Sequence, residues 1–235
     1  MSLPVLNTPN HEMEIPSTGE KVTYRPFLVK EQKILMMAQE SSDESNMIRA
    51  IGDIVKSCTY GKIDRPHDMP TFDLEYMFLM IRAKSVGSDI ELKITCPDDA
   101  ETVVDHKINL DEIKVKHTEG HTNQVMLTDD IGVELRYPTM DMVRGFALDN
   151  AKQTELSFEL IRNTIKTVFD KEQVYDDMSA KDLDNFIEQM NTEQFEKISN
   201  FYETMPKLAH MIKVTNPNTG VESEIKLEGL QSFLE

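Results

Sequence analysis

Two groups of residues in the sequence have types and spacing that suit a metal ion. The first is His117-Thr118-Glu119-Gly120-His121, where two imidazoles and a carboxylate come close together in the chain. Imidazole and carboxylate are both zinc ligands, and such a site would serve a metal-dependent hydrolase. The segment is polar and contains a glycine, however. We therefore favour the interpretation that these are solvated histidines of a loop, and we keep the hydrolase as a distant alternative.

The second group comes from two similar stretches, residues 93–113 and 213–230. Both have the order strand, Thr, x, Pro, x, x, Ala or Gly, strand, Leu and an acidic residue. A turn of this form resembles the knuckle of a zinc ribbon, in which two knuckles supply four ligands to one metal. The ligand positions here would be Cys96, Asp99, Asn216 and Thr219. Asn and Thr hardly bind zinc, so we expect metal-free hairpins whose knuckles are joined by hydrogen bonds if the hairpins pair.

No other pattern in the chain indicates catalysis. The sequence contains no G-x-S-x-G, no Walker loop, no dinucleotide-binding glycine pattern and no His-Glu-x-x-His helix. Cys58 ends an apolar helical segment with no basic neighbour to activate it, so we interpret it as a core residue. The sequence therefore predicts no enzyme, no catalytic residue and no cofactor.

Charge and cysteine content limit the kind of partner. The 235 residues carry 25 Lys and Arg against 42 Asp and Glu, a formal charge of −17. This balance argues against a nucleic-acid backbone or an anionic membrane as the main partner. Two cysteines make no disulfide framework, and the N-terminal residues show no signal-peptide pattern, which favours a reducing cytoplasm. The 15 methionines suit an adaptable protein interface.

The element that must organise the fold is a helix over about residues 71–87. Its apolar residues cover more than one side, which predicts a core helix. Thr71 is the expected N-cap and Gly87 the expected left-handed C′ residue. Around this helix we expect an α+β fold with β-hairpins at the N-terminus, in the middle and at the C-terminus, the last two resembling degenerate zinc-ribbon knuckles.

The other elements follow from hydrophobic period and turn residues. Alternation predicts a hairpin over 12–28, another over 90–110 and strands over 124–137, with Pro138 closing the β region. An apolar stripe of Ile34, Leu35, Met37 and Ala38 predicts one helix, and a second begins at Ser42 or Asp43. Further helices are expected from Thr139 and over 154–169, 180–189 and 192–208, the last two capped by Ser179 and Thr192. We expect a flexible arm (1–12) and a single α+β domain (13–235) with subregions 13–87, 88–137 and 138–235.

Two long segments carry a resemblance to a known family. They are Ile15–Ser41, which includes Arg25-Pro26-Phe27-Leu28-Val29-Lys30-Glu31, and Asp68–Pro97, which includes Phe72-Asp73-Leu74-Glu75-Tyr76 and Arg82-Ala83-Lys84-Ser85. With Leu227-Glu228-Gly229-Leu230-Gln231 and Phe233, they resemble the T4-type bacteriophage baseplate proteins described as hub subunits and hub assembly factors. Members of that family tend to have Cys-Pro-x-Cys-Gly-like turns, of which this chain keeps only Cys96.

The resemblance implies a phage tail protein, made in the cytoplasm of the infected bacterium, that acts in building the baseplate hub. Its partners would be other hub or tail proteins, and it would work by binding through an exposed apolar or Met-rich surface, as an assembly chaperone. The alternative is a structural hub subunit that stays in the virion baseplate. The candidate partner-binding residues are Arg25, Phe27, Tyr76 and Phe233. For Phe27 and Arg25 the other interpretation is structural, with Phe27 packed on the central helix and Arg25 paired to an acidic neighbour.

Overall fold

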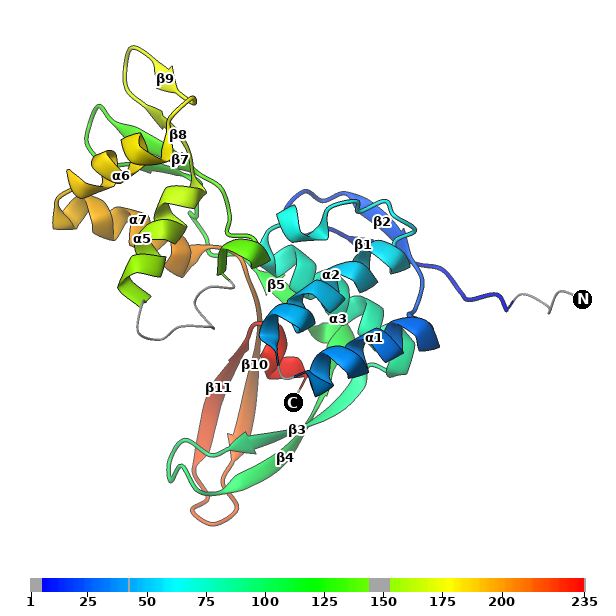
Figure 1. The fold of residues 1–235 in the computed structure, drawn as a ribbon. Coiled ribbons are helices and arrows are strands. Elements are labelled where there is room, and N and C mark those ends of the chain that lie inside the picture. The colour runs from blue at the N-terminus through cyan, green and yellow to red at the C-terminus, as the bar shows by residue number, and fades with distance from the viewer. Residues whose placement is uncertain (1–5, 42, 144–152, 235) are drawn as a thin grey trace, which may run out of the picture. The chain divides into compact units, whose positions relative to one another are not determined.

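A computed structural model describes residues 6–41, 43–143 and 153–234 of the chain (Figure 1). The chain divides into two compact units. Unit 1 comprises Met1–Lys116 and Lys207–Glu235, and unit 2 comprises His117–Pro206. Both units mix helices with small antiparallel sheets, so the predicted combination of α and β structure is confirmed.

Unit 1 is built around helix α3 (Thr71–Val86), the predicted central helix. Leu74, Met77 and Ile81 are completely buried, and residues on the other sides of the helix are buried as well. The remaining α-helices and strands described in unit 1 are β1 (His11–Glu14), β2 (Lys21–Tyr24), α1 (Val29–Glu40), α2 (Glu44–Cys58), β3 (Asp89–Thr95), β4 (Val103–Asn109), β5 (Lys114–Lys116), β10 (Lys207–Thr215) and β11 (Glu222–Glu228). Short 3₁₀ helices lie at Pro66–Asp68 and Leu110–Glu112.

The ends of α3 correct one detail of the sequence analysis. Thr71 is the first helical residue rather than the N-cap, because the extended Pro70 precedes it and its carbonyl accepts from the amides of Asp73 and Leu74. Gly87 does end the helix with a positive φ of 106°, a conformation that glycine adopts without a Cβ clash. Asp43, one of the two predicted caps of α2, accepts a hydrogen bond from the amide of Ser45 at 2.9 Å.

Three hairpins flank the helices of unit 1, as predicted. Strands β1 and β2 pair with each other, and so do β3 and β4. Strand β10 lies between β11 and β5 in a three-stranded sheet. The pairing of β5 with Lys207–Ala209 of β10 is not visible in the sequence, since β5 has only three residues and its partner lies far along the chain. A final 3₁₀ helix, Leu230–Phe233, buries Leu230 and Phe233.

Unit 2 contains a four-stranded antiparallel sheet and helices that share its core. The sheet has the order β6-β7-β8-β9. The elements are β6 (Gln124–Met126), β7 (Gly132–Leu135), α5 (Gln153–Thr164), β8 (Ile165–Phe169), β9 (Val174–Tyr175), α6 (Ala180–Glu188) and α7 (Thr192–Thr204). Val133 and Leu135 of the sheet pack with Ile198 and Phe201 of α7 in this core. Ser179 caps α6 as predicted, with a capping box to Asp182.

The helix predicted over 154–169 is wrong in its last third, because Ile165–Phe169 forms strand β8. Here β-branched residues are frequent and the segment pairs with β7, and this tertiary pairing overrides the helical period. The period itself misleads because β8 carries a bulge: Glu134 pairs with Thr167 but Leu135 pairs with Ile165. The additional residue leaves Ile165 and Val168 both buried at a spacing that also fits a helix.

Three other predictions concern Pro138, the ends of α7 and the helix after Thr139. Strands β8 and β9 follow Pro138, so that proline does not close the β region. Asn191, not Thr192, caps α7, and the helix ends at Thr204 because Pro206 follows and β10 begins. The helix expected with Thr139 as its cap does begin at Met140, and its continuation over residues 144–152 lies outside the described part of the chain.

The two units do not follow the three expected subregions. The C-terminal hairpin belongs to unit 1 because β10 pairs with β5. Unit 2 is the stretch of sequence that runs from the end of β5 to the start of β10. Across the described ranges we found no helix with the length and apolarity that a membrane span requires.

Candidate protein interface

The Arg25 side chain is part of a buried network rather than a surface. Its exposed fraction is 7%, and that of Glu31 is 2%. Nη2 of Arg25 lies 2.8 Å from Oε1 of Glu31, and Ser57 Oγ donates to the same carboxylate oxygen at 2.8 Å. Arg25 is therefore paired with an acidic neighbour, and its buried side chain is not open to a partner.

The other three predicted partner-binding residues do not form one exposed patch. Phe233 is completely buried, so it cannot meet a partner directly. Tyr76 is partly buried on α3, and burial raises the pKa of its phenol. Phe27 is also partly buried, and its amide donates to Ser85 Oγ at 2.9 Å at the end of α3. These aromatic and apolar residues belong mainly to the packing around α3.

The His117–His121 segment does not form a metal site in the described structure. His117 and Glu119 are exposed, whereas His121 packs against Tyr137 and Phe201 at ring-centroid distances of 5.7 and 5.1 Å, and those two rings stack on each other. Nδ1 of His121 lies 2.9 Å from Thr204 Oγ1. Burial, followed by the nearby His117, lowers the pKa of His121. No cluster of three or more His, Cys, Asp or Glu side chains suitable for a metal occurs among the residues that the structure describes.

The tips of the β3–β4 and β10–β11 hairpins are joined at the predicted knuckle positions. Both turns have the same backbone pattern: the amide of Ala100 donates to the carbonyl of Cys96, and the amide of Gly220 donates to that of Asn216. Nδ2 of the completely buried Asn216 donates to Asp98 at 3.0 Å and to Asp99 at 2.9 Å.

Two more hydrogen bonds join the same tips. The Thr219 hydroxyl donates to Asp98, and Asn218 Nδ2 donates to Thr102 Oγ1 at 2.9 Å. The bonds from Thr219 and Asn216 lower the pKa of Asp98, and bonds from Thr102, Asn216 and Glu101 lower that of Asp99. Burial raises the pKa of the Cys96 thiol, which favours its neutral form. Hydrogen bonds therefore join the two knuckles, whereas the resemblance to a metal-binding zinc ribbon is not supported.

Replacing Asn216 with aspartate should separate the two tips. The substitution keeps the side-chain oxygen that accepts from the Asn218 amide, but it removes the Nδ2 donor and brings a third carboxylate to Asp98 and Asp99. We expect the free energy of unfolding at pH 7 to fall by about 2 kcal/mol, measured by urea titration. Asn218→Asp is the matched control, since that exposed side chain donates a single hydrogen bond within the described structure, to Thr102 Oγ1. Equal losses in the two variants would contradict the role given to Asn216.

Beyond its short pairing with β5, one edge of β10 has no neighbouring strand among the residues that the structure describes. Backbone groups of alternate residues in an antiparallel strand point to opposite sides. Leu208 accepts from the Gly229 amide at 2.9 Å and the Asn216 amide donates to Val221 at 2.9 Å, so even-numbered residues bond toward β11. The amides and carbonyls of Met211 and Lys213 therefore point away from β11. Strand β5 does not reach them, since its pairing stops at Ala209.

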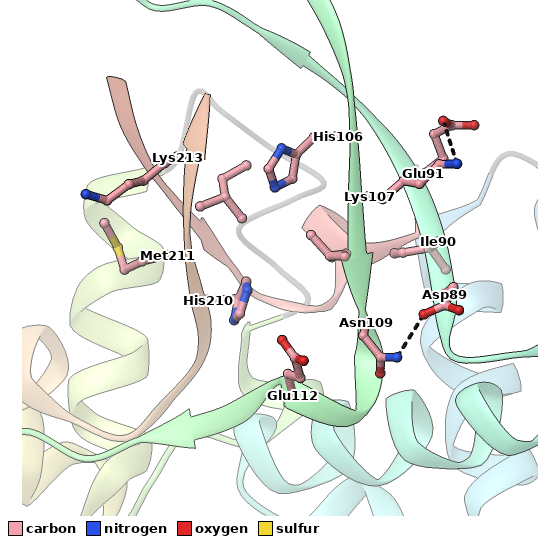
Figure 2. A pocket seen from close by; sticks show the side chains of 12 residues that line it. Asp89, Ile90, Glu91, His106, Lys107, Asn109, Glu112, His210, Met211 and Lys213 are labelled. Atoms are coloured by element: carbon pink, nitrogen blue, oxygen red, sulfur yellow. Dashed lines mark hydrogen bonds and ion pairs between the residues drawn. The ribbon is translucent and has the colours of Figure 1, made fainter. Parts of the chain in front are cut away.

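Strand β4 has an open edge of the same kind. The Leu110 amide donates to Ser88 at 2.8 Å, so even-numbered residues of β4 bond toward β3. The backbone groups of Lys107 and Asn109 then point to the other side, where β4 has no neighbour among the described strands. Figure 2 shows this edge and β10 on opposite sides of one pocket.

This pocket, which we call the hairpin cleft, is a candidate site for an extended segment of another protein. Its volume is about 830 Å³. Its walls include both open edges, and the residues that line it include His106, Lys107, Asn109, His210, Met211 and Lys213. Unpaired strand edges bind extended chains by adding a strand, and main-chain hydrogen bonds supply the affinity. The sequence predicted both hairpins, but it could not show that their open edges meet.

The protein therefore combines α and β structure, and its candidate binding groups are the unpaired backbone amides and carbonyls of β4 and β10. The chain matches the family model described as T4 bacteriophage base plate protein over residues 8–235, essentially its full length. The chain belongs to that family, which confirms the resemblance found in the sequence and gives it a role in the phage baseplate. Separate comparisons with curated proteins and with solved structures found no match.

Proposed function

We propose that this protein acts in assembly of the baseplate central hub by binding another hub or tail protein, without catalysis. It is an assembly factor or chaperone that works in the cytoplasm of the infected bacterium. The alternative is a structural hub subunit retained in the virion. The formal charge of −17 supports a protein partner over nucleic acid or an anionic membrane, and it suits a soluble, recyclable factor.

The observation that carries the proposal is the pair of open strand edges on either side of the hairpin cleft. The edge of β10 offers the backbone groups of Met211 and Lys213, and that of β4 offers those of Lys107 and Asn109. The hairpin tips are hydrogen-bonded together and β5 pairs with β10 at the base, so both edges are held before a partner arrives. Such preorganisation lowers the ordering cost of binding.

Met211→Pro tests this site with little effect on the fold. The Met211 amide points into the cleft, so proline removes a donor for a guest strand while the bonds from β10 to β11 remain. Met211→Ala removes the same side chain, which is 44% exposed, but keeps the amide. Each tagged variant is used to capture baseplate proteins from infected-cell lysate, and mass spectrometry quantifies the proteins recovered.

We expect the proline variant to recover about tenfold less of the baseplate partner than the alanine variant, since tenfold equals about 1.4 kcal/mol, close to one hydrogen bond. Circular dichroism must show that both variants are folded. Equal recovery by the two would mean that the partner does not bind the β10 edge.

A further inference from the structure

Helix α1 is buried on one side only, and its solvent side is unusually apolar. Glu31 and Ala38 are buried, with exposed fractions of 2% and 7%. At 100° per residue, the opposite side carries five residues within an arc of roughly 100°. We call these five residues the α1 outer face: Val29, Lys33, Met36, Met37 and Glu40.

The apolar members of the α1 outer face are well exposed. The exposed fractions are 80% for Val29, 54% for Met36 and 60% for Met37. Ile34 adds a further 40% exposed side chain at the rim of the face. Several large apolar side chains grouped on one helix face indicate a contact surface, and methionine adapts well to such contacts.

The charges on this face are arranged symmetrically about its centre. Lys33 lies three residues before Met36, and Glu40 lies three residues after Met37. The face is therefore basic toward its start and acidic toward its end, with two methionines between.

We propose that the α1 outer face binds the same face of a second copy of this chain, with the two helices antiparallel. A twofold axis between Met36 and Met37 places the methionines of both copies at the centre of the contact. Each Lys33 then lies opposite Glu40 of the other copy. A twofold interface requires this self-complementarity, because every contact occurs twice.

The charge pattern favours this occupant and this orientation. Parallel helices would place Lys33 beside Lys33 and Glu40 beside Glu40, which is repulsive. Helix α1 has 12 residues, or about 18 Å of length, so the contact is small and the dimer is weak. The contact uses a part of unit 1 other than the open edges of the hairpin cleft, so the inference does not depend on the proposed function.

A charge exchange tests the dimer directly. The wild type, Lys33→Glu, Glu40→Lys and the double variant are compared by sedimentation velocity over a range of concentrations. Each single variant places like charges in both symmetric pairs, and we expect it to weaken the dimer at least about tenfold. The double variant restores opposite charges with the partners exchanged, and we expect its dissociation constant to lie within about threefold of the wild-type value.

The controls separate this proposal from misfolding and from binding of another protein. Both charged positions are exposed, and circular dichroism should show the same fold in all four proteins. A wild type that stays monomeric at high concentration would overturn the proposal. So would a double variant as weak as the single ones. If the wild type is monomeric and Met36→Glu abolishes capture of a baseplate protein, the face binds that protein instead of a second copy.

Discussion

Replacing Arg25 with alanine is expected to lower the free energy of unfolding by about 3–5 kcal/mol, because it leaves a buried carboxylate without its main partner. Glu31 is 2% exposed and accepts from Arg25 at 2.8 Å, from Ser57 at 2.8 Å and from the Leu28 amide at 2.8 Å. Lys30 also approaches this carboxylate, at 3.4 Å, but its side chain is 66% exposed and offsets little of the loss. Urea titration followed by circular dichroism measures the change.

The same variant should change the response to acid. Burial alone would raise the pKa of Glu31, but hydrogen bonds from Arg25, Ser57 and Leu28 outweigh it and lower the pKa from 4.5 to about 2. The folded pKa is below the unfolded one, so this carboxylate stabilises the fold above pH 4.5. That stabilisation is lost as the pH falls from 4.5 toward 2. In Arg25→Ala, stability should fall less steeply over this interval than in the wild type.

Lys56→Ala is the matched control for this ion pair. Lys56 lies 2.7 Å from Asp64, but the two side chains are 48% and 77% exposed, so water screens the pair and its loss should cost less than about 1 kcal/mol. A similar loss of stability in Arg25→Ala and Lys56→Ala would contradict the account of the buried network.

Replacing Phe78 with alanine is the second large change, with an expected loss of about 3–5 kcal/mol. Phe78 is 1% exposed in α3, and its neighbours on the same helix, Leu74 and Met77, are completely buried. The helix contacts α2, β5, β10 and the C-terminal 3₁₀ helix, so the cavity would lie where the helices and hairpins of unit 1 meet. Thermal and urea unfolding measure the loss.

Val86→Ala on the same helix provides the comparison. Val86 is 57% exposed, and its truncation should change the free energy of unfolding by less than about 0.5 kcal/mol. If Phe78→Ala were as mild as Val86→Ala, α3 would not be the core helix of unit 1.

The sequence was most informative where local pattern and tertiary packing agree. Helix α3 was predictable because apolar residues cover several of its sides, and the β3–β4 and β10–β11 hairpins because alternation and turn residues coincide. The likeness of the two turns also pointed to Asn216 and Asp99, which are hydrogen-bonded at the tips.

Features that depend on distant pairing could not be predicted. Strand β8 has buried residues at a helical spacing because of its bulge, and only its pairing with β7 makes it a strand. For Arg25 the sequence leaves open whether it binds a partner or pairs with an acidic neighbour, and nothing in the local sequence of Phe233 shows that it lies in the core. The hairpin cleft arises from two strands about a hundred residues apart.

The exposed stripe of α1 shows a related limit. The hydrophobic period puts Ile34 and Met37 on the apolar side of this helix, yet both side chains are exposed, while the charged Glu31 is buried. Hydrophobic period predicts a helix but does not decide which side the rest of the protein covers, and here the buried side carries Glu31, paired with Arg25.

The central claim, that this baseplate protein is an assembly factor, is tested most directly by quantitative mass spectrometry of purified virions beside the infected-cell lysate. Its amount is compared in both with that of an abundant tail protein. We predict that the protein is plentiful in the lysate and absent from virions. A fixed whole-number ratio to the tail protein in virions would contradict the claim and identify a structural baseplate subunit.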